Sequence, residues 1–227
     1  METVVQGTLR TSGRDYDIKT VTRAYNFEIR AEHDEKNGYH IVGRPIVYDS
    51  KTDLGCFDEI IERGALDGAD LRDVRFLVNH NTLMIPLARS RRNNENSTMQ
   101  LKVVAEGMDI RVNLDVENNT EAKNLYSAIK RGDITGMSFM FSIDDEEWEN
   151  LKSDHPTRRI KKIGVVLEVS AVTFPAYEAT EISARAKETL DSVKATLDNV
   201  RAQSVDTDSG NDNLELEKLK AKILYQI

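Results

Sequence analysis

Most of the chain shows the two-residue alternation of apolar and polar side chains that predicts half-buried β-strands. Residues 25–30 alternate in this way, Asn37-Gly38 marks a tight turn, and residues 39–48 predict the returning strand of a hairpin. Pro45 inside that strand indicates an edge position or a bulge, because proline cannot donate to a ladder. Antiparallel pairing therefore begins near the N-terminal end.

Three further strands each carry one reactive side chain. They cover residues 76–80 with His80, residues 136–143 with Ser138, and residues 160–174 with Glu168. The bulky residues of the Ser138 segment share one face, so the serine points the other way. Residues 99–103 and 110–114 also alternate and predict a meander. Residues 144–156, which include Trp148, predict an exposed hairpin tip.

Other segments have helical spacing or none. Residues 120–131 carry an apolar stripe and end at Gly132, which predicts a helix, and residues 57–66 predict a short helix or turn that ends at Gly64. The chain divides into a loosely ordered arm (1–20), a main domain (21–182), a helix (183–203), a flexible linker (204–213) and an amphipathic tail (214–227). These elements predict an α+β, mainly antiparallel fold.

Composition limits the function. The formal net charge of −8 argues against a nucleic-acid-coating protein, and no apolar run approaches the length needed to span a bilayer. We therefore expect no nucleic-acid partner, no membrane and an intracellular location. Basic clusters at residues 89–92 and 158–162 are interpreted as solvated loops or protein contacts. The single cysteine, Cys56, cannot form an internal disulfide and is interpreted as a partly buried thiol.

A serine needs an imidazole base, and usually a third group to orient that base. His80 and Glu168 could supply both for Ser138, although strand serines and glutamates are ordinary and a histidine at a strand end is often only structural. His155 is an alternative third member. His33 and His40 fit no zinc spacing, so we expect neither a metal nor a cofactor.

Several motifs in chain order resemble those of the prohead (capsid maturation) serine proteases of tailed bacteriophages. They are residues 43–48, 57–66, 76–81, 86–90, 129–141 and 167–177. The resemblance implies a β-barrel wrapped by helices, as in the herpesvirus maturation protease, with His80 as base, Ser138 as nucleophile and Glu168 as third member. Met140 stands where members of the family often have a small residue, which implies a narrower cleft.

The same resemblance implies a serine endopeptidase that acts inside the assembling prohead in the host cytoplasm. It would cleave the scaffolding part of the major capsid protein and itself, so the expected partners are the capsid protein, or a fused scaffold domain, and a homo-oligomer. Arg89 and Ser90 are candidate oxyanion donors by position. A non-catalytic scaffold protein, or a carboxylate hydrolase that uses Asp133 with Glu168, are the competing hypotheses.

Overall fold

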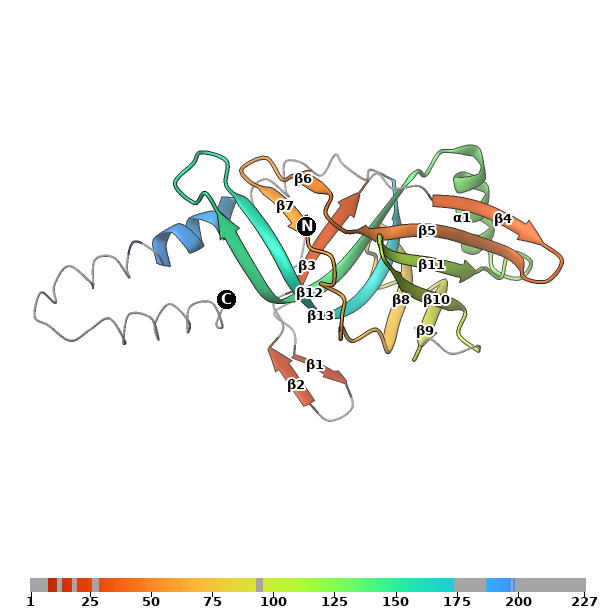
Figure 1. Cartoon of the computed structure of the whole chain (residues 1–227). Helices are drawn as coiled ribbons and strands as arrows, with labels where there is room; N and C mark the ends of the chain where they lie inside the picture. Colours follow the sequence, from red (N-terminus) through yellow and green to blue (C-terminus); the bar gives the residue numbers. More distant parts are fainter. Residues whose placement is uncertain are drawn as a thin grey trace, which may run out of the picture. The chain divides into compact units, whose positions relative to one another are not determined.

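The computed structural model shows a protein built mainly from β-strands. The structure describes residues 8–11, 14–17, 20–25, 29–92, 96–173, 187–196 and 198. The strands before the helix are β1 (Thr8–Thr11), β2 (Arg14–Asp17), β3 (Thr20–Tyr25), β4 (Ile29–Asp34), β5 (Gly38–Val47), β6 (Lys51–Asp53), β7 (Asp58–Ile61), β8 (Asp73–Val78), β9 (Ala88–Arg91), β10 (Met99–Val104) and β11 (Gly107–Asn113). Helix α1 (Thr120–Arg131) and the long strands β12 (Gly136–Glu149) and β13 (Thr157–Val172) follow (Figure 1).

The described strands form three sheets. One is the pair β1–β2, one has the order β10-β11-β5-β4, and the largest has the order β3-β12-β13-β7-β6, with β8 paired to β13 and β9 paired to β8. Most pairs are antiparallel, as predicted, but β13 runs parallel to β7 and β8. In the part of the chain that the structure describes, the largest sheet ends at β3 and β6 without closing. The mainly β prediction is confirmed, and the closed barrel is not observed.

The residues fall into two compact units. The first comprises Met1–Tyr48, Arg63–Asp144 and Lys162–Tyr177, and the second comprises Asp49–Glu62, Asp145–Lys161 and Glu178–Ile227. The chain passes from one unit to the other within β12 and again within β13. Residues 204–227, predicted as linker and tail, lie outside the described residues.

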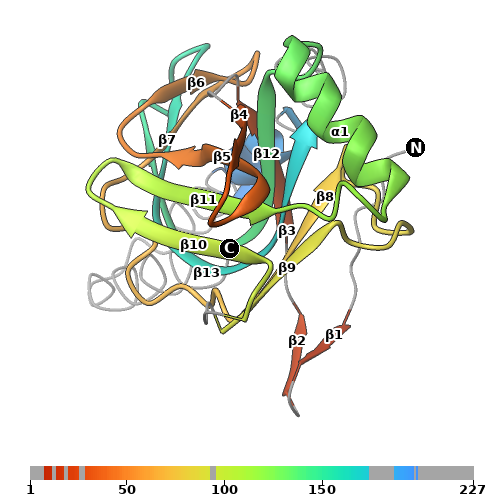
Figure 2. The same ribbon diagram turned by 90° about the vertical axis from the view of Figure 1, so that its right-hand side faces the viewer.

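The four-stranded sheet of the first unit forms as the alternation predicts. Asp34 Oδ1 accepts from the backbone N–H of Asn37 at 2.7 Å, and Gly38 (φ +63°) closes the β4–β5 turn. The register between β11 and β5 slips near Pro45, so the predicted bulge is confirmed. Figure 2 shows α1 beside this sheet, where Tyr126 meets Tyr39 edge-on with ring centroids 5.2 Å apart.

Helix α1 begins and ends as its sequence predicts. The Asn119 side chain caps the first turn by accepting from the backbone N–H groups of Glu121 and Ala122, and Gly132 ends the helix in the left-handed conformation. The apolar stripe is buried. The helix therefore leads directly into β12, the strand that carries Ser138.

One predicted element is wrong, and another lies partly outside the described residues. Of the strand predicted over residues 25–30, Tyr25 ends β3 of the largest sheet and Ile29 begins β4 of the four-stranded sheet, and residues 26–28 lie outside the described residues. Residues 57–66 contain the strand β7, paired with β6 and β13, rather than a helix; only the turn at Gly64 (φ +90°) is as predicted. In so short a run, apolar residues among acids fit both the helical period of 3.6 residues and the strand period of two. Pairing with β6 and β13 decided in favour of the strand.

The second unit has its own small core. Leu54, Phe57 and Leu190 are buried together, and the Trp148 ring packs against the Phe57 ring with centroids 4.8 Å apart. Residues 144–149 continue β12 instead of forming the exposed tip that was predicted. Leu190 belongs to helical residues 187–196, which lie within the segment predicted as a helix over 183–203. Burial raises the pKa of the neighbouring Cys56 thiol, which keeps it protonated and a poor nucleophile.

A buried arginine links three strands of the second unit. Arg158 donates from Nε to Glu146 at 2.7 Å and pairs with Glu59 at 3.4 Å, and its guanidinium lies 5.7 Å from the centre of the Trp148 ring. Part of the 158–162 basic cluster is thus buried and paired, which corrects the expectation of a solvated loop or protein contact for Arg158. A buried guanidinium needs such partners because an unpaired buried charge is costly.

Candidate functional site

His80 lies in a strained turn just beyond β8. The strand ends at Val78, and both Asn79 (φ 50°) and His80 (φ 54°) adopt the left-handed conformation. This conformation is uncommon for residues other than glycine, although asparagine and histidine adopt it several-fold more often than most. The prediction of a strand that extends from residue 76 to His80 is therefore wrong, because the strand ends at Val78. The turn re-aims the imidazole, and strain of this kind is typical of functional sites.

Asn79 fixes this turn to the end of β13. Its backbone N–H donates to the Ala171 carbonyl at 2.9 Å. Its side-chain Nδ2 donates to Thr173 Oγ1 at 3.0 Å, and its Oδ1 accepts from the Thr173 N–H at 2.9 Å. Three hydrogen bonds thus hold the residue that precedes the imidazole.

The imidazole of His80 is bonded to the carboxylate of Glu168. Nδ1 lies 2.5 Å from Oε1, with the Glu168 side chain 4% exposed and the His80 side chain 18% exposed. An ionised carboxylate on Nδ1 fixes the proton of neutral histidine there and directs the lone pair of Nε2 outward. The pair can therefore act as an oriented base.

Ser170 completes this arrangement, although the sequence analysis gave it no role. Its hydroxyl donates to Glu168 Oε2 at 2.6 Å and accepts from the backbone N–H of His80 at 3.1 Å. Ser170 is fully buried. Its place two residues after Glu168, on the same face of the strand, was the signal that could have identified it.

Ser138 is the third residue of β12 and is fully buried. Its backbone pairs with Ala24 of β3, and its Oγ donates to the Arg23 carbonyl at 2.7 Å. Met137 and Phe139 are also buried, as the alternation predicts for the opposite face. The structure therefore joins His80 to Glu168 and gives the Ser138 hydroxyl a backbone partner on β3.

Contacts between β12 and β13 indicate their alignment. Ser142 Oγ accepts from the Val165 N–H at 3.1 Å, and Lys162 lies 3.7 Å from Asp144. A Cβ added to Gly164 would lie 2.7 Å from Ser142 Oγ, so a side chain at position 164 would face Ser142. The two strands run antiparallel, with position 142 level with positions 164 and 165.

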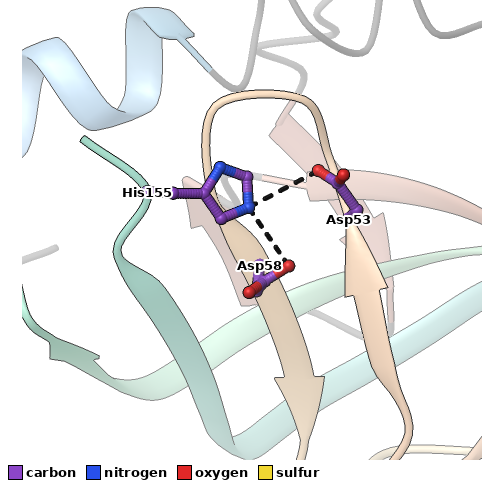
Figure 3. A group of neighbouring side chains, drawn as sticks. All are labelled: Asp53, Asp58 and His155. Carbon is purple, nitrogen blue, oxygen red and sulfur yellow. Dashed lines mark ion pairs between the residues drawn. The ribbon is translucent and has the colours of Figure 1, made fainter. Parts of the chain in front are cut away.

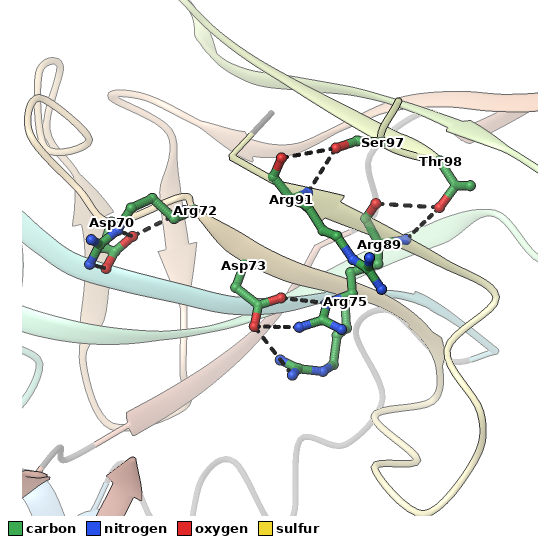
Figure 4. A network of polar contacts seen from close by, with 8 residues as sticks. All are labelled: Asp70, Arg72, Asp73, Arg75, Arg89, Arg91, Ser97 and Thr98. Carbon is green, nitrogen blue, oxygen red and sulfur yellow. Dashed lines mark hydrogen bonds and ion pairs between the residues drawn. The ribbon is translucent and has the colours of Figure 1, made fainter. Parts of the chain in front are cut away.

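Arg89, one of the two candidate oxyanion donors, has partners of its own (Figure 4). The Arg89 guanidinium holds Asp73 with two bonds of 2.6 and 2.8 Å, and the Arg89 N–H donates to Thr98 Oγ1 at 2.8 Å. The hydrogen bond to Asp73 raises the pKa of Arg89. Ser90 is fully buried. Their oxyanion role stays a prediction, and for Arg89 it requires release from Asp73 or from Thr98.

His155 belongs to a different cluster, in the second unit (Figure 3). Its Nε2 lies 3.2 Å from Asp58 and 3.6 Å from Asp53, so it is engaged away from Glu168. Burial opposes ionisation of Asp58, but bonds from Lys51 and His155 hold its pKa below the ordinary value. Asp53, Asp58 and His155 each offer one atom that could bind a metal ion, and these three atoms lie within 4.8 Å of one another. The ammonium group of Lys51 already forms an ion pair with Asp58 in this cluster.

The competing carboxylate pair is not assembled in the same way. Asp133 accepts from Arg131 at 2.8 Å and has an exposed side chain, whereas Glu168 is buried against His80.

Within the described residues, no helix has the length and apolar character needed to cross a membrane.

A buried carboxylate that orients an imidazole, in a molecule that also carries a strand serine, is a combination typical of serine hydrolases. The sequence profile of the caudovirus prohead serine proteases matches residues 25–196, and the chain belongs to that family. The predicted resemblance is thereby confirmed.

The chain was also compared with solved structures and with curated proteins. The solved structure of the bacteriophage T4 capsid assembly protease, gp21, is 12% identical in sequence, with a TM-score of 0.39. The match covers 67% of this chain and 96% of that one. A search of curated proteins finds no match.

Proposed function

We propose that this protein is a serine endopeptidase of prohead maturation that works through an acyl-enzyme. Its family membership supports a protease, and the observation that carries the assignment of residues is the 2.5 Å bond between His80 and Glu168. Few structural roles require a buried carboxylate to hold a mostly buried imidazole on a strained turn.

Ser138 is the proposed nucleophile. Continuing the β12–β13 alignment from position 142 brings Ser138 level with Glu168 or Val169, on the next strand. The two-residue period then favours the same face for Ser138 and Glu168, because it relates them to Ser142 and position 164. Rotation of the Ser138 hydroxyl from the Arg23 carbonyl toward Nε2 of His80 would complete the set.

The mechanism then follows ordinary acyl transfer. Nε2 of His80 takes the proton from Ser138 Oγ as this oxygen bonds to the scissile carbonyl carbon. The same proton passes to the leaving amine as the C–N bond breaks. A water, deprotonated by the same imidazole, hydrolyses the ester and regenerates Ser138. Glu168 stabilises the imidazolium in both halves, and Ser170 holds Glu168 in place.

The proposed substrates are the scaffolding part of the major capsid protein and the chain itself. Cleavage would take place inside the assembling prohead, in the host cytoplasm, and a homo-oligomer is a further proposed partner. These assignments rest on the family, whose description names both the prohead and the serine protease activity. The amphipathic tail predicted over 214–227 is proposed to dock on a capsid component or on a second copy of the chain, and to be removed by self-cleavage.

Co-expression with the capsid protein of the same phage tests the proposal. The wild type should shorten the capsid protein, and a fluorophosphonate probe should label Ser138. Ser138→Ala should abolish both signals. Ser142→Ala is the matched control, since Ser142 is a second buried serine of β12 and should retain both. Equal cleavage by Ser138→Ala and the wild type would overturn the assignment of the nucleophile.

A specific observation favours one alternative. The Ser138 hydroxyl is fully buried and donates to a backbone carbonyl, as a structural serine would. A non-catalytic capsid-assembly protein would keep this arrangement. It would support capsid assembly without labelling by the probe and without shortening the capsid protein.

A further inference from the structure

The loop that follows His80 is ordered by its own hydrogen bonds. Asn81 donates from its backbone N–H to the Val78 carbonyl at 3.1 Å, and Leu87 donates to the Phe76 carbonyl at 3.0 Å. Within the loop, Leu83 donates to Asn81 Oδ1 at 3.1 Å and Met84 to the Asn81 carbonyl at 3.2 Å. The loop is thus a defined structure anchored to β8.

This ordered loop displays two large apolar side chains. Leu83 is 96% exposed and Ile85 is 83% exposed, the two highest values for large hydrophobic residues in the described part of the chain. Pro86 restricts Ile85 to an extended backbone and thereby limits its ability to turn inward. Exposed apolar residues that gather at one place mark binding surfaces more often than isolated ones do.

The position of the loop indicates what it contacts. Leu83 follows His80 by three residues, which the backbone can span in about 10 Å. A polypeptide whose leaving amine receives a proton from His80 must pass within a few residues' length of this loop. Two side chains provide far less than the roughly 800 Å² per partner that a stable protein interface buries. Transient contact with a passing substrate needs much less area.

We propose that Leu83 and Ile85 form a substrate-binding surface that selects polypeptides with apolar side chains next to the scissile bond. The proposal rests on the proposed endopeptidase function and adds the substrate class to it. The loop presents hydrophobic surface to the substrate, while His80 at its base is held by Glu168 and Ser170 and needs no help from the loop.

A mixed synthetic peptide library, digested and read by mass spectrometry, tests the proposal. The full-length wild type should prefer peptides with Leu, Ile or Val near the cleaved bond. The double variant Leu83→Ser/Ile85→Ser should lose about tenfold or more of this preference, the usual effect of a lost apolar contact. Val103→Ser is the matched control, because Val103 is also exposed (40%) but lies on β10. Leu83→Met/Ile85→Val should retain the preference.

Labelling of Ser138 by a small fluorophosphonate separates the proposed endopeptidase function from the proposed substrate-binding role of the loop. The double variant should label as fast as the wild type, since the probe needs no substrate side chain. A labelled double variant with unchanged preference overturns the loop proposal and leaves the protease intact. A smaller mass by light scattering with unchanged preference assigns the loop to self-association and also overturns it. A wild type that neither labels nor cleaves overturns both proposals.

Discussion

The imidazole of His80 and the carboxylate of Glu168 meet at 2.5 Å although 88 positions separate them in the chain. The parallel pairing of β8 with β13 brings them together, because it aligns Val78 with Ala171. The turn after Val78 then folds the imidazole back over β13. The contact therefore depends on strand order and on an unusual backbone conformation at once.

Glu168→Gln should reduce turnover by roughly 10³- to 10⁴-fold, because an amide can present its N–H to Nδ1 and so stabilise the wrong tautomer. The rate of capsid-protein cleavage measures this. Glu32→Gln is the matched control, since Glu32 also lies beside a histidine, 3.3 Å from His40. Turnover within a few-fold of the wild type in Glu168→Gln would contradict the orienting role of Glu168.

Ser170→Ala should lower kcat by about 10²-fold with little change in KM, because the hydroxyl positions Glu168 and His80 rather than the substrate. Ser170→Thr keeps the hydroxyl and should restore most of the activity. A structural defect alone would lower the melting temperature without this split between kcat and KM. If Ser170→Ala retains the wild-type kcat, Ser170 has no positioning role.

Asn79 contributes through its conformation and its side chain, and two variants separate these effects. Asn79→Gly keeps the left-handed turn but loses the bonds to Thr173, which should lower the free energy of unfolding by about 1–2 kcal/mol. Asn79→Ala also strains the backbone and should cost about 1 kcal/mol more. Chemical denaturation measures both. An alanine variant as stable as the glycine variant would show that the turn relaxes.

Low pH should weaken the contribution of Asp73 to the stability of the folded protein. Its bond from Arg89 lowers its pKa, an effect that burial opposes. A lowered folded pKa stabilises the protein above the ordinary aspartate value of about 3.9, and this stability is lost as the pH falls through the folded pKa. The difference in unfolding free energy between the wild type and Asp73→Asn should be about 1 kcal/mol at pH 7 and shrink below pH 4.

Asp154→Asn, at an exposed loop position, is the control for this measurement. Its difference from the wild type should stay small across the same pH range. A gap between the wild type and Asp73→Asn that widens in acid would contradict the sign of the shift.

The sequence by itself determined the elements that depend on local pattern. The caps and stripe of α1, the turn between β4 and β5, and the β10–β11 pair all follow from residues close together in the chain. The motifs also gave the family. Ser138, His80 and Glu168 could be selected from those motifs, because chemistry and chain order need no coordinates.

Only the tertiary structure decided how these parts meet. The strand nature of β7 depends on partners from β6 and β13, and the position of His80 outside its strand depends on a left-handed turn held by Asn79 and Thr173. The hydrogen bond from the His80 N–H to Ser170 likewise exists only because β8 lies beside β13. Strand pairing joins residues that are distant in the chain, and the period of a single segment cannot specify its partner.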